Sequence, residues 1–310
     1  MRVLVVGAGA VGGYFGGRLL EAGRDVTFLV RPRRRAQLAA DGLIIASSFG
    51  DARLAAPTVS AEEISGSWDL VILSCKAYDL PKAMDSMAPA VGPETTILPL
   101  LNGMAHLDEL DRRFGVECVL GGLCSLAVTM DGQGAIRHLN QMHNLAFGER
   151  AGGESARVKS IAELMRPANF HWRASTDIIL EMWEKWVFLS ALAAGTCLLR
   201  ARVGDIVVAG GKDILLGLLS ESQSVAEAAG HGARPDILDK TRALLSAAGS
   251  VLTASMLRDI ESGGPVEADH VIGDLLRRAQ ASGLALPLLR LAQLHLNAYE
   301  ARRQRESAPS

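Results

Sequence analysis

The stretch MRVLVVGAGAVGGYFGGRLLE, residues 1–21, decides the fold of the first half of the chain. Its apolar start predicts a short buried strand, and its helix-forming end predicts a helix. Between them stands the pattern G-x-G-x-x-G, made of Gly7, Ala8, Gly9, Ala10, Val11 and Gly12. In a strand–turn–helix unit this turn binds the pyrophosphate of a dinucleotide. A glycine-rich turn without a ligand is disfavoured, because strand, turn and helix occur together and in this order.

The second predicted strand, residues 25–31, ends without a carboxylate. Sites selective for NAD place an acidic residue about twenty residues beyond the glycines, where it binds the ribose 2′-hydroxyl. Here Arg31 stands at that place, and a guanidinium suits a 2′-phosphate. Arg33, Arg34 and Arg35 add positive charge, although we expect at least two of the three on a solvated helix face. We therefore predict NADP(H) as the cofactor, with Arg31 as the ligand of the 2′-phosphate.

Length and composition indicate a globular protein of two domains. The chain has 310 residues, which is longer than a typical single domain. Of these residues, 49% are hydrophobic and 21% are charged, as in an ordinary globular protein. A net charge of -2 does not indicate binding to nucleic acid or to an anionic membrane, which would require an excess of positive charge. The longest apolar run, residues 187–199, is shorter than the ~20 residues that span a bilayer. We expect a soluble, cytoplasmic protein with neither nucleic acid nor membrane as a partner.

The four cysteines predict reduced thiols. They lie far apart and form no C-x-x-C pair, at positions Cys75, Cys118, Cys124 and Cys197. This spacing indicates neither a metal site nor a disulfide framework.

The pattern of apolar residues changes once along the chain. Up to about residue 147, short β-rich runs alternate with helical segments, which predicts a doubly wound sheet with an antiparallel or mixed extension. From Asp177 to residue 303 the apolar residues recur with helical spacing. The predicted fold is thus α/β, an N-terminal Rossmann-type doubly wound sheet with a C-terminal all-helical domain. We place the NADP-binding domain at residues 1–176 and a helical substrate or dimerisation domain at residues 177–310.

Polar residues at the ends of two predicted strands are the first candidates for a site. Lys76 follows the wholly apolar run 70–73, and Asn102 follows the strand predicted over residues 95–101. Open α/β sheets bind ligands at the carboxyl ends of their strands. Both residues are therefore candidates for a ligand site, although Lys76 on its own would more simply be a loop charge.

Three residues of the helical half form a second group of candidates. Lys185 lies within a predicted apolar helix, where on its own it could equally be a surface lysine paired with Glu181 or Glu184. Ser255 and Glu267 stand on either side of a Gly-Gly-Pro turn. In isolation, capping or solvent exposure would explain these two residues.

Taken together, the motifs resemble the ketopantoate reductase (2-dehydropantoate 2-reductase) family over the whole length of the chain. They are, in order, GAGAVG at residues 7–12, Arg31, SCKAYD around Lys76, LLNGM around Asn102, W-x-K ending at Lys185, ASMLRDI around Ser255 and VEAD around Glu267. The resemblance implies NADPH-dependent reduction of a 2-oxo acid to a 2-hydroxy acid.

The resemblance also implies a role for each matched residue. The glycines would hold the pyrophosphate and Arg31 the 2′-phosphate, while Lys76 and Asn102 would contact the cofactor near its ribose and nicotinamide. Lys185 would be the catalytic lysine, and the substrate would contact Ser255, Glu267, Lys185 and Asn102. Hydride transfer to a ketone leaves an alkoxide, so a cation polarises the carbonyl and supplies the proton. Glu267 would orient that ammonium group.

Two positions depart from the family. Its members carry asparagines one and two turns after the catalytic lysine, where this chain has Leu189 and Ala193. Both share a helical face with Lys185, so the stripe that faces the substrate is apolar. We therefore predict a 2-oxo acid whose side chain is more apolar or bulkier than that of ketopantoate, or carries fewer hydroxyls. Other polar residues could compensate after a small register shift, namely Ser190, Thr196 and Asn140.

Two other interpretations stay open. β-Hydroxyacid dehydrogenases also join a Rossmann domain to helices and use a lysine followed by asparagine, although Leu189 stands at that place here. A non-catalytic NADPH-binding sensor would tolerate Leu189 and Ala193, although Lys185, Ser255 and Glu267 favour an enzyme. The long apolar helices of the second half are compatible with a homodimer.

Overall fold

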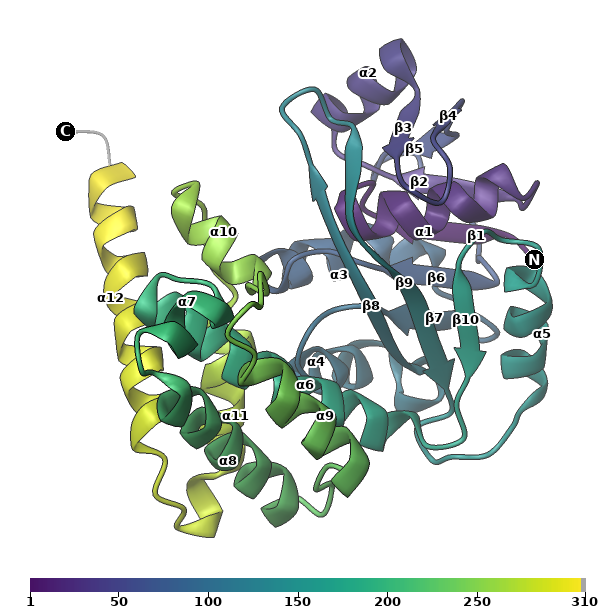
Figure 1. Ribbon diagram of the computed structural model, residues 1–310. Coiled ribbons are helices and arrows are strands. Elements are labelled where there is room, and N and C mark those ends of the chain that lie inside the picture. Colours follow the sequence, from purple (N-terminus) through teal and green to yellow (C-terminus); the bar gives the residue numbers. More distant parts are fainter. Residues whose placement is uncertain (308–310) are drawn as a thin grey trace. The chain divides into compact units, whose positions relative to one another are not determined.

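The computed structural model describes residues 1–307, which form two compact units (Figure 1). Unit 1 comprises Met1–Leu101 and His106–Ile178, and unit 2 comprises Asn102–Ala105 and the chain from Ile179 onward. The short segment Asn102–Ala105 thus belongs to unit 2, although it directly follows a strand region of unit 1.

The first sheet of unit 1 has five parallel strands in the order β5-β2-β1-β6-β7. They are β1 (Val3–Val6), β2 (Val26–Leu29), β5 (Thr58–Val59), β6 (Leu70–Leu73) and β7 (Thr96–Pro99). Val6 of β1 is in register with Leu29 of β2 on one side and Leu73 of β6 on the other. After β1 the chain adds β2 and β5 on one side of it, and then β6 and β7 on the other side. The carboxyl end of β1 is therefore the switch point where such sheets bind ligands. The predicted doubly wound sheet is confirmed.

A second, mixed sheet of unit 1 is built around a long hairpin (Figure 1). Its strands are β3 (Leu43–Ala46), β4 (Ala52–Leu54), β8 (Gly121–Met130), β9 (Ile136–Gly148) and β10 (His171–Ala174). The order is β10-β9-β3-β4, with β8 paired antiparallel to β9. The mixed extension expected from the sequence therefore takes the form of a separate sheet.

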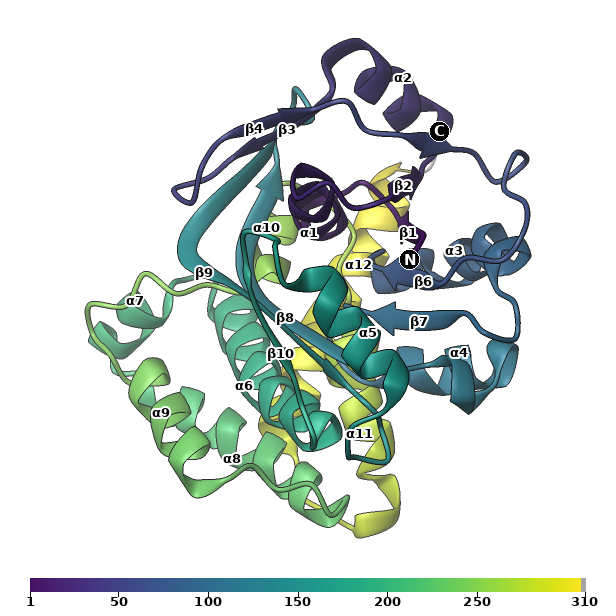
Figure 2. The same cartoon turned by 90° about the vertical axis from the view of Figure 1, so that its right-hand side faces the viewer.

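Helix α1 (Ala10–Glu21) lies between the two sheets (Figure 2). Its glycines make this possible, because a Cβ at Gly16 would lie 2.7 Å from the ring of Phe28 in the first sheet, and one at Gly17 would lie 2.7 Å from Ile45 in the second. The two aromatic residues that precede these glycines, Tyr14 and Phe15, are fully buried in the core. The repeated Gly-Gly pairs of the opening sequence thus allow a helix to pack tightly on two faces.

The other helices of unit 1 surround the sheets. They are α2 (Pro32–Asp41), α3 (Leu80–Met87), α4 (Ala105–Phe114) and α5 (Ala156–Met165). Ser155 caps α5, since its hydroxyl accepts a hydrogen bond from the Val158 amide at 3.2 Å.

Unit 2 is all helical within the described residues, as the sequence predicts. Its helices are α6 (Ile178–Leu199), α7 (Val203–Val208), α8 (Lys212–Ala228), α9 (Pro235–Leu245), α10 (Ser255–Glu261), α11 (Asp274–Arg278) and α12 (Pro287–Ser307). A π-helical turn, Asp269–Gly273, precedes α11. Among residues 1–307, no helix has the length and apolar character needed to cross a membrane.

Candidate functional site

The glycine turn after β1 has the geometry of an anion site. Gly7 has φ +93°, which favours glycine, and it turns the chain out of the strand. Gly9 is the N-cap of α1, where no side chain caps the helix and no acidic residue occupies the first turn. A Cβ at Gly9 would meet nothing within 4 Å, so the space beside the uncapped amides is open. Uncapped amides next to open space fit a pyrophosphate at this helix start.

Gly12 has a different role from Gly9. A Cβ at Gly12 would lie 2.1 Å from Ser74 Oγ and 2.4 Å from the Gly7 carbonyl oxygen. This close approach seats α1 against the ends of β1 and β6. The packing explains why the third glycine of the pattern is needed even without a ligand.

The basic residues after β2 occupy three different environments. Arg31 is 70% exposed, and its guanidinium donates to Asp79 Oδ1 at 2.7 Å. Arg34 is partly buried and donates from Nε to the Ala8 carbonyl at 3.0 Å, so it supports the glycine turn; burial lowers its pKa. Arg33 is exposed, and Arg35 pairs with a glutamate at the surface. Sequence reasoning missed the Asp79 partner and the contact of Arg34 with the turn.

Lys76 lies just beyond β6, at the carboxyl end of the first sheet. It is half-buried and stands at the N-cap of the short 3-10 turn Ala77–Asp79. Lys76 therefore lies at a strand end, as the sequence predicts.

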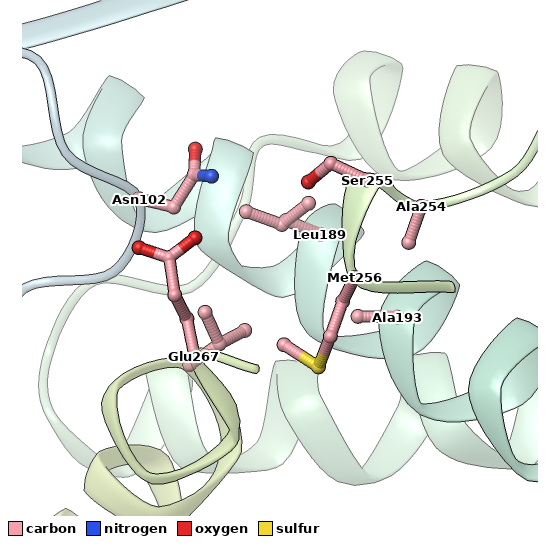
Figure 3. A pocket seen from close by; sticks show the side chains of 8 residues that line it. Asn102, Leu189, Ala193, Ala254, Ser255, Met256 and Glu267 are labelled. Atoms are coloured by element: carbon pink, nitrogen blue, oxygen red, sulfur yellow. The ribbon is translucent and has the colours of Figure 1, made fainter. Parts of the chain in front are cut away.

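A pocket of unit 2 gathers most of the residues singled out in the helical half (Figure 3). It is a small pocket, partly open to solvent, and is lined by Asn102, Leu189, Ala193, Ala254, Ser255, Met256, Glu267 and Val271. The Asn102 amide and the Glu267 carboxylate lie at one end, whereas Met256 and Ala193 lie at the other. The Ser255 hydroxyl lies on the side of Ala254 and Met256, so the polar groups of the pocket are not confined to one end. Met256 is a lining residue that the sequence analysis did not identify.

Lys185 lies on α6, one turn before Leu189, and is half-buried. It is not among the residues that line the pocket. The pairing with Glu184 that the sequence allowed is not formed, because the buried Glu184 carboxylate accepts hydrogen bonds from Arg234 at 2.7 and 2.6 Å. Within residues 1–307 the Lys185 ammonium has neither a hydrogen bond nor an ion pair, so no partner ties it to the helix surface.

The chain on either side of Glu267 is fixed by hydrogen bonds. Before it, the Val266 amide donates to Glu300 Oε1 at 2.7 Å, and the Tyr299 hydroxyl donates to the Gly264 carbonyl at 2.7 Å. After it, the π-helical turn presents the Val271 carbonyl to the Trp186 indole of α6 at 2.8 Å. The sequence predicts an ordinary helix there. A π-turn beside a polar pocket is a common feature of functional sites.

None of the polar residues proposed as substitutes for the missing asparagines lines the pocket. The Ser190 hydroxyl donates to the Val271 carbonyl at 3.4 Å, and the Thr196 hydroxyl donates to Leu192 O at 2.7 Å. Asn140 lies in the β8–β9 hairpin, where its side-chain oxygen accepts from the Ala127 amide. The α6 side of the pocket is therefore apolar beyond Lys185.

A parallel sheet with a glycine turn at its switch point, joined to a helical unit with a polar pocket, defines a Rossmann-type oxidoreductase. Two family models match this chain. "Ketopantoate reductase PanE/ApbA" matches residues 3–152, and "Ketopantoate reductase PanE/ApbA C terminal" matches residues 177–300. The chain belongs to the ketopantoate reductase family. The predicted resemblance is confirmed, and the family decides against the β-hydroxyacid dehydrogenase interpretation.

Relatives and solved structures agree with this assignment. An uncharacterized oxidoreductase, YkpB, of Bacillus subtilis is 36% identical over 302 residues, which cover 97% of this chain and 99% of the relative. A 2-dehydropantoate 2-reductase of Mesorhizobium japonicum is 30% identical, with 88% and 89% covered. The crystal structure of 2-dehydropantoate 2-reductase from Geobacter metallireducens has a TM-score of 0.87 at 28% identity, and covers 96% of this chain and 99% of that chain.

Proposed function

We propose that this protein reduces a 2-oxo acid to a 2-hydroxy acid with NADPH, and that the side chain of its substrate is more apolar than that of ketopantoate. The pocket of unit 2 carries the proposal, because it combines Asn102, Ser255 and Glu267 with an apolar wall at Leu189 and Ala193. Polar groups can orient the keto acid, and the wall can accept its side chain.

The cofactor part of the proposal rests on unit 1. The glycine turn from Gly7 to Gly12 would hold the pyrophosphate on the uncapped start of α1. Arg31, at the end of β2, would bind the 2′-phosphate, and Lys76 and Asn102 would contact the ribose and nicotinamide portions. The bound dinucleotide supplies the hydride. The name of the Mesorhizobium relative, a 2-dehydropantoate 2-reductase, supports a reductase that acts on this class of acid.

The catalytic part of the proposal assigns roles to residues of unit 2. Lys185 would polarise the carbonyl and donate the proton that the alkoxide takes up. Glu267, which is 9% exposed and lies in the pocket, would orient the ammonium group. Asn102 and Ser255 would donate hydrogen bonds to substrate oxygens.

The substrate class follows from what the pocket lacks. A hydroxyl on the substrate side chain would face Leu189, Ala193 and Met256, none of which can accept or donate a strong hydrogen bond. Desolvation of an unpaired hydroxyl disfavours binding by about 1–3 kcal/mol. An alkyl or aryl side chain avoids this penalty and buries apolar surface instead.

The test is NADPH oxidation, followed by absorbance, with ketopantoate beside branched, aromatic and aliphatic 2-oxo acids. We expect an apolar 2-oxo acid to give the highest kcat/KM. Faster turnover of ketopantoate would overturn the substrate assignment and leave the reductase. Binding of NADPH without turnover of any 2-oxo acid would instead support a sensor.

The assembly and location of the enzyme complete the proposal. We expect a cytoplasmic homodimer, in keeping with the long apolar helices of unit 2. Light scattering on the purified chain measures the oligomeric state directly, and a monomer at micromolar concentration would contradict the dimer.

A further inference from the structure

The guanidinium proposed to bind the 2′-phosphate already has an anionic partner. Arg31 Nη2 lies 2.7 Å from Asp79 Oδ1, and the Asp79 side chain is 31% exposed. Asp79 ends the 3-10 turn Ala77–Asp79, which follows β6. Arg31, the proposed phosphate ligand, therefore forms an ion pair with a residue that follows a different strand.

The pair lies at the place where nucleotide selectivity is decided. β1 stands between β2 and β6, and Arg31 follows β2 whereas Asp79 follows β6. The two side chains thus meet across the carboxyl end of β1, from which the Gly7 turn begins. In this fold the group that contacts the ribose 2′ position stands at the end of the second strand. A carboxylate within hydrogen-bond distance of Arg31 has access to the same position.

Asp79 changes the electrostatics of that position in two ways. Its charge offsets that of Arg31 and repels a 2′-phosphate, which carries up to two negative charges. Its second oxygen is able to accept a hydrogen bond from a ribose 2′-hydroxyl, as acidic residues do in NAD sites. Of the neighbouring cations, Arg34 is held by the Ala8 carbonyl and Arg35 by Glu63, whereas Arg33 is exposed.

We propose that Asp79 is a selectivity residue for the cofactor. Its carboxylate competes with the 2′-phosphate for Arg31 and accepts the 2′-hydroxyl, so the protein binds NADH beside NADPH. The inference rests on the proposed function in requiring that the glycine turn binds a nicotinamide dinucleotide and that Arg31 binds its 2′-phosphate.

The test is the dissociation constant of each dinucleotide, NADPH and NADH, measured by calorimetry without substrate on the full chain. In the unchanged protein we expect the two constants to lie within about tenfold of each other. Asp79→Asn frees Arg31 and removes the repulsion, so it should raise the preference for NADPH by about tenfold, the effect of one charge-assisted hydrogen bond. The adenosine fragments 2′,5′-ADP and 5′-ADP should show the same shift, because the nicotinamide takes no part in it.

Glu63→Gln is the matched control. It breaks the Arg35–Glu63 ion pair, which has the same 2.7 Å contact and in which Arg35 lies on α2, one turn beyond its N-cap residue Arg31. In this variant the ratio of the dissociation constants for NADPH and NADH should stay unchanged within about twofold, because Arg35 is not at the strand end. An equal shift in Glu63→Gln would show a general effect of net charge and would overturn the proposal.

A double-mutant cycle separates competition for Arg31 from the other effects of Asp79. In an Arg31→Ala background, Asp79→Asn should shift the ratio by clearly less than in the unchanged protein. An unchanged ratio in Asp79→Asn, with both dinucleotides still bound, would overturn this inference and leave the proposed function intact. If the unchanged protein binds neither dinucleotide, both fail.

Discussion

The glycine turn of unit 1 and the pocket of unit 2 are built in opposite ways. The turn is six consecutive residues, and its properties come from the backbone, namely a positive φ at Gly7 and open space at Gly9. The pocket is made of side chains from separate segments, including Asn102, Leu189 and Glu267. The shape of a site made of backbone depends on the positions of its glycines, because these residues have no side chain. A site made of side chains can change its specificity without any change of fold.

The two sites therefore fail differently when they are altered. A side chain added to the turn either collides with the protein or blocks the ligand, depending on the glycine. A side chain exchanged in the pocket alters which molecule fits or reacts. The predictions below test this contrast.

The largest expected effect is the loss of reduction in Lys185→Ala. Removal of the proposed proton donor should lower kcat by about 10²–10⁴-fold, the usual contribution of general acid catalysis. NADPH binding, measured by calorimetry, should stay unchanged because the proposed cofactor site lies in the glycine turn. Lys212→Ala is the control, since Lys212 is an exposed lysine on another helix of unit 2. Full activity in Lys185→Ala would contradict the catalytic assignment.

Gly12→Ala and Gly9→Ala should separate the two kinds of glycine. The Gly12 variant forces a Cβ to within 2.4 Å of the Gly7 carbonyl oxygen, so we expect a loss of about 1–3 kcal/mol in the free energy of unfolding. The Gly9 variant meets no protein atom within 4 Å. It should keep its stability within about 0.5 kcal/mol and lose dinucleotide affinity. Urea unfolding and calorimetry measure both quantities, and equal losses of stability would refute the distinction.

A smaller effect is expected from Leu189→Asn combined with Ala193→Asn. The two amides would give a substrate hydroxyl partners on the pocket wall, so the ratio of kcat/KM for ketopantoate over an apolar 2-oxo acid should rise by about tenfold. The ratio serves as its own control, because any loss of stability affects both substrates alike. A constant ratio would mean that these positions do not contact the substrate side chain.

The glycine turn could be predicted from the sequence because its signal is local. Strand, glycines and helix follow one another within residues 1–21, and each part restricts the next. The positions of Lys76 and Asn102 after strands followed from the same kind of local pattern. These residues needed no knowledge of distant contacts.

Contacts between distant segments could not be predicted in this way. Arg34 donates to the Gly134 carbonyl, and Arg31 pairs with Asp79, yet periodicity carries no information about such partners. The π-helical turn at Asp269–Gly273 looks like helix in the sequence, because an apolar stripe does not distinguish the two. Met256 was missed as a lining residue for the same reason, since its place in the pocket depends on where α10 packs.

Unit 1 also contains a buried histidine, which allows its stability to be changed without touching the pocket. His143 is 2% exposed, its Nδ1 lies 2.9 Å from the Tyr14 hydroxyl, and its ring stacks on Phe49 at 3.7 Å between centroids. Burial lowers the pKa of His143 from 6.5 to about 4, helped by electrostatic interactions with His171, His138 and Arg18. The imidazole is therefore neutral in the folded protein over the physiological range.

The smallest effect is therefore a dependence of folding on pH. The folded pKa of His143 lies below the unfolded value, so between about pH 6.5 and 4 the unfolded chain binds more protons and stability falls as the pH falls. From pH 7 to pH 5.5 this group should remove about 1 kcal/mol from the free energy of unfolding. His143→Phe keeps the aromatic stack and cannot titrate, so it should lose about 1 kcal/mol less than the unchanged protein over the same interval in urea unfolding. Equal losses in the two proteins would show that His143 is protonated as readily in the folded chain as in the unfolded one.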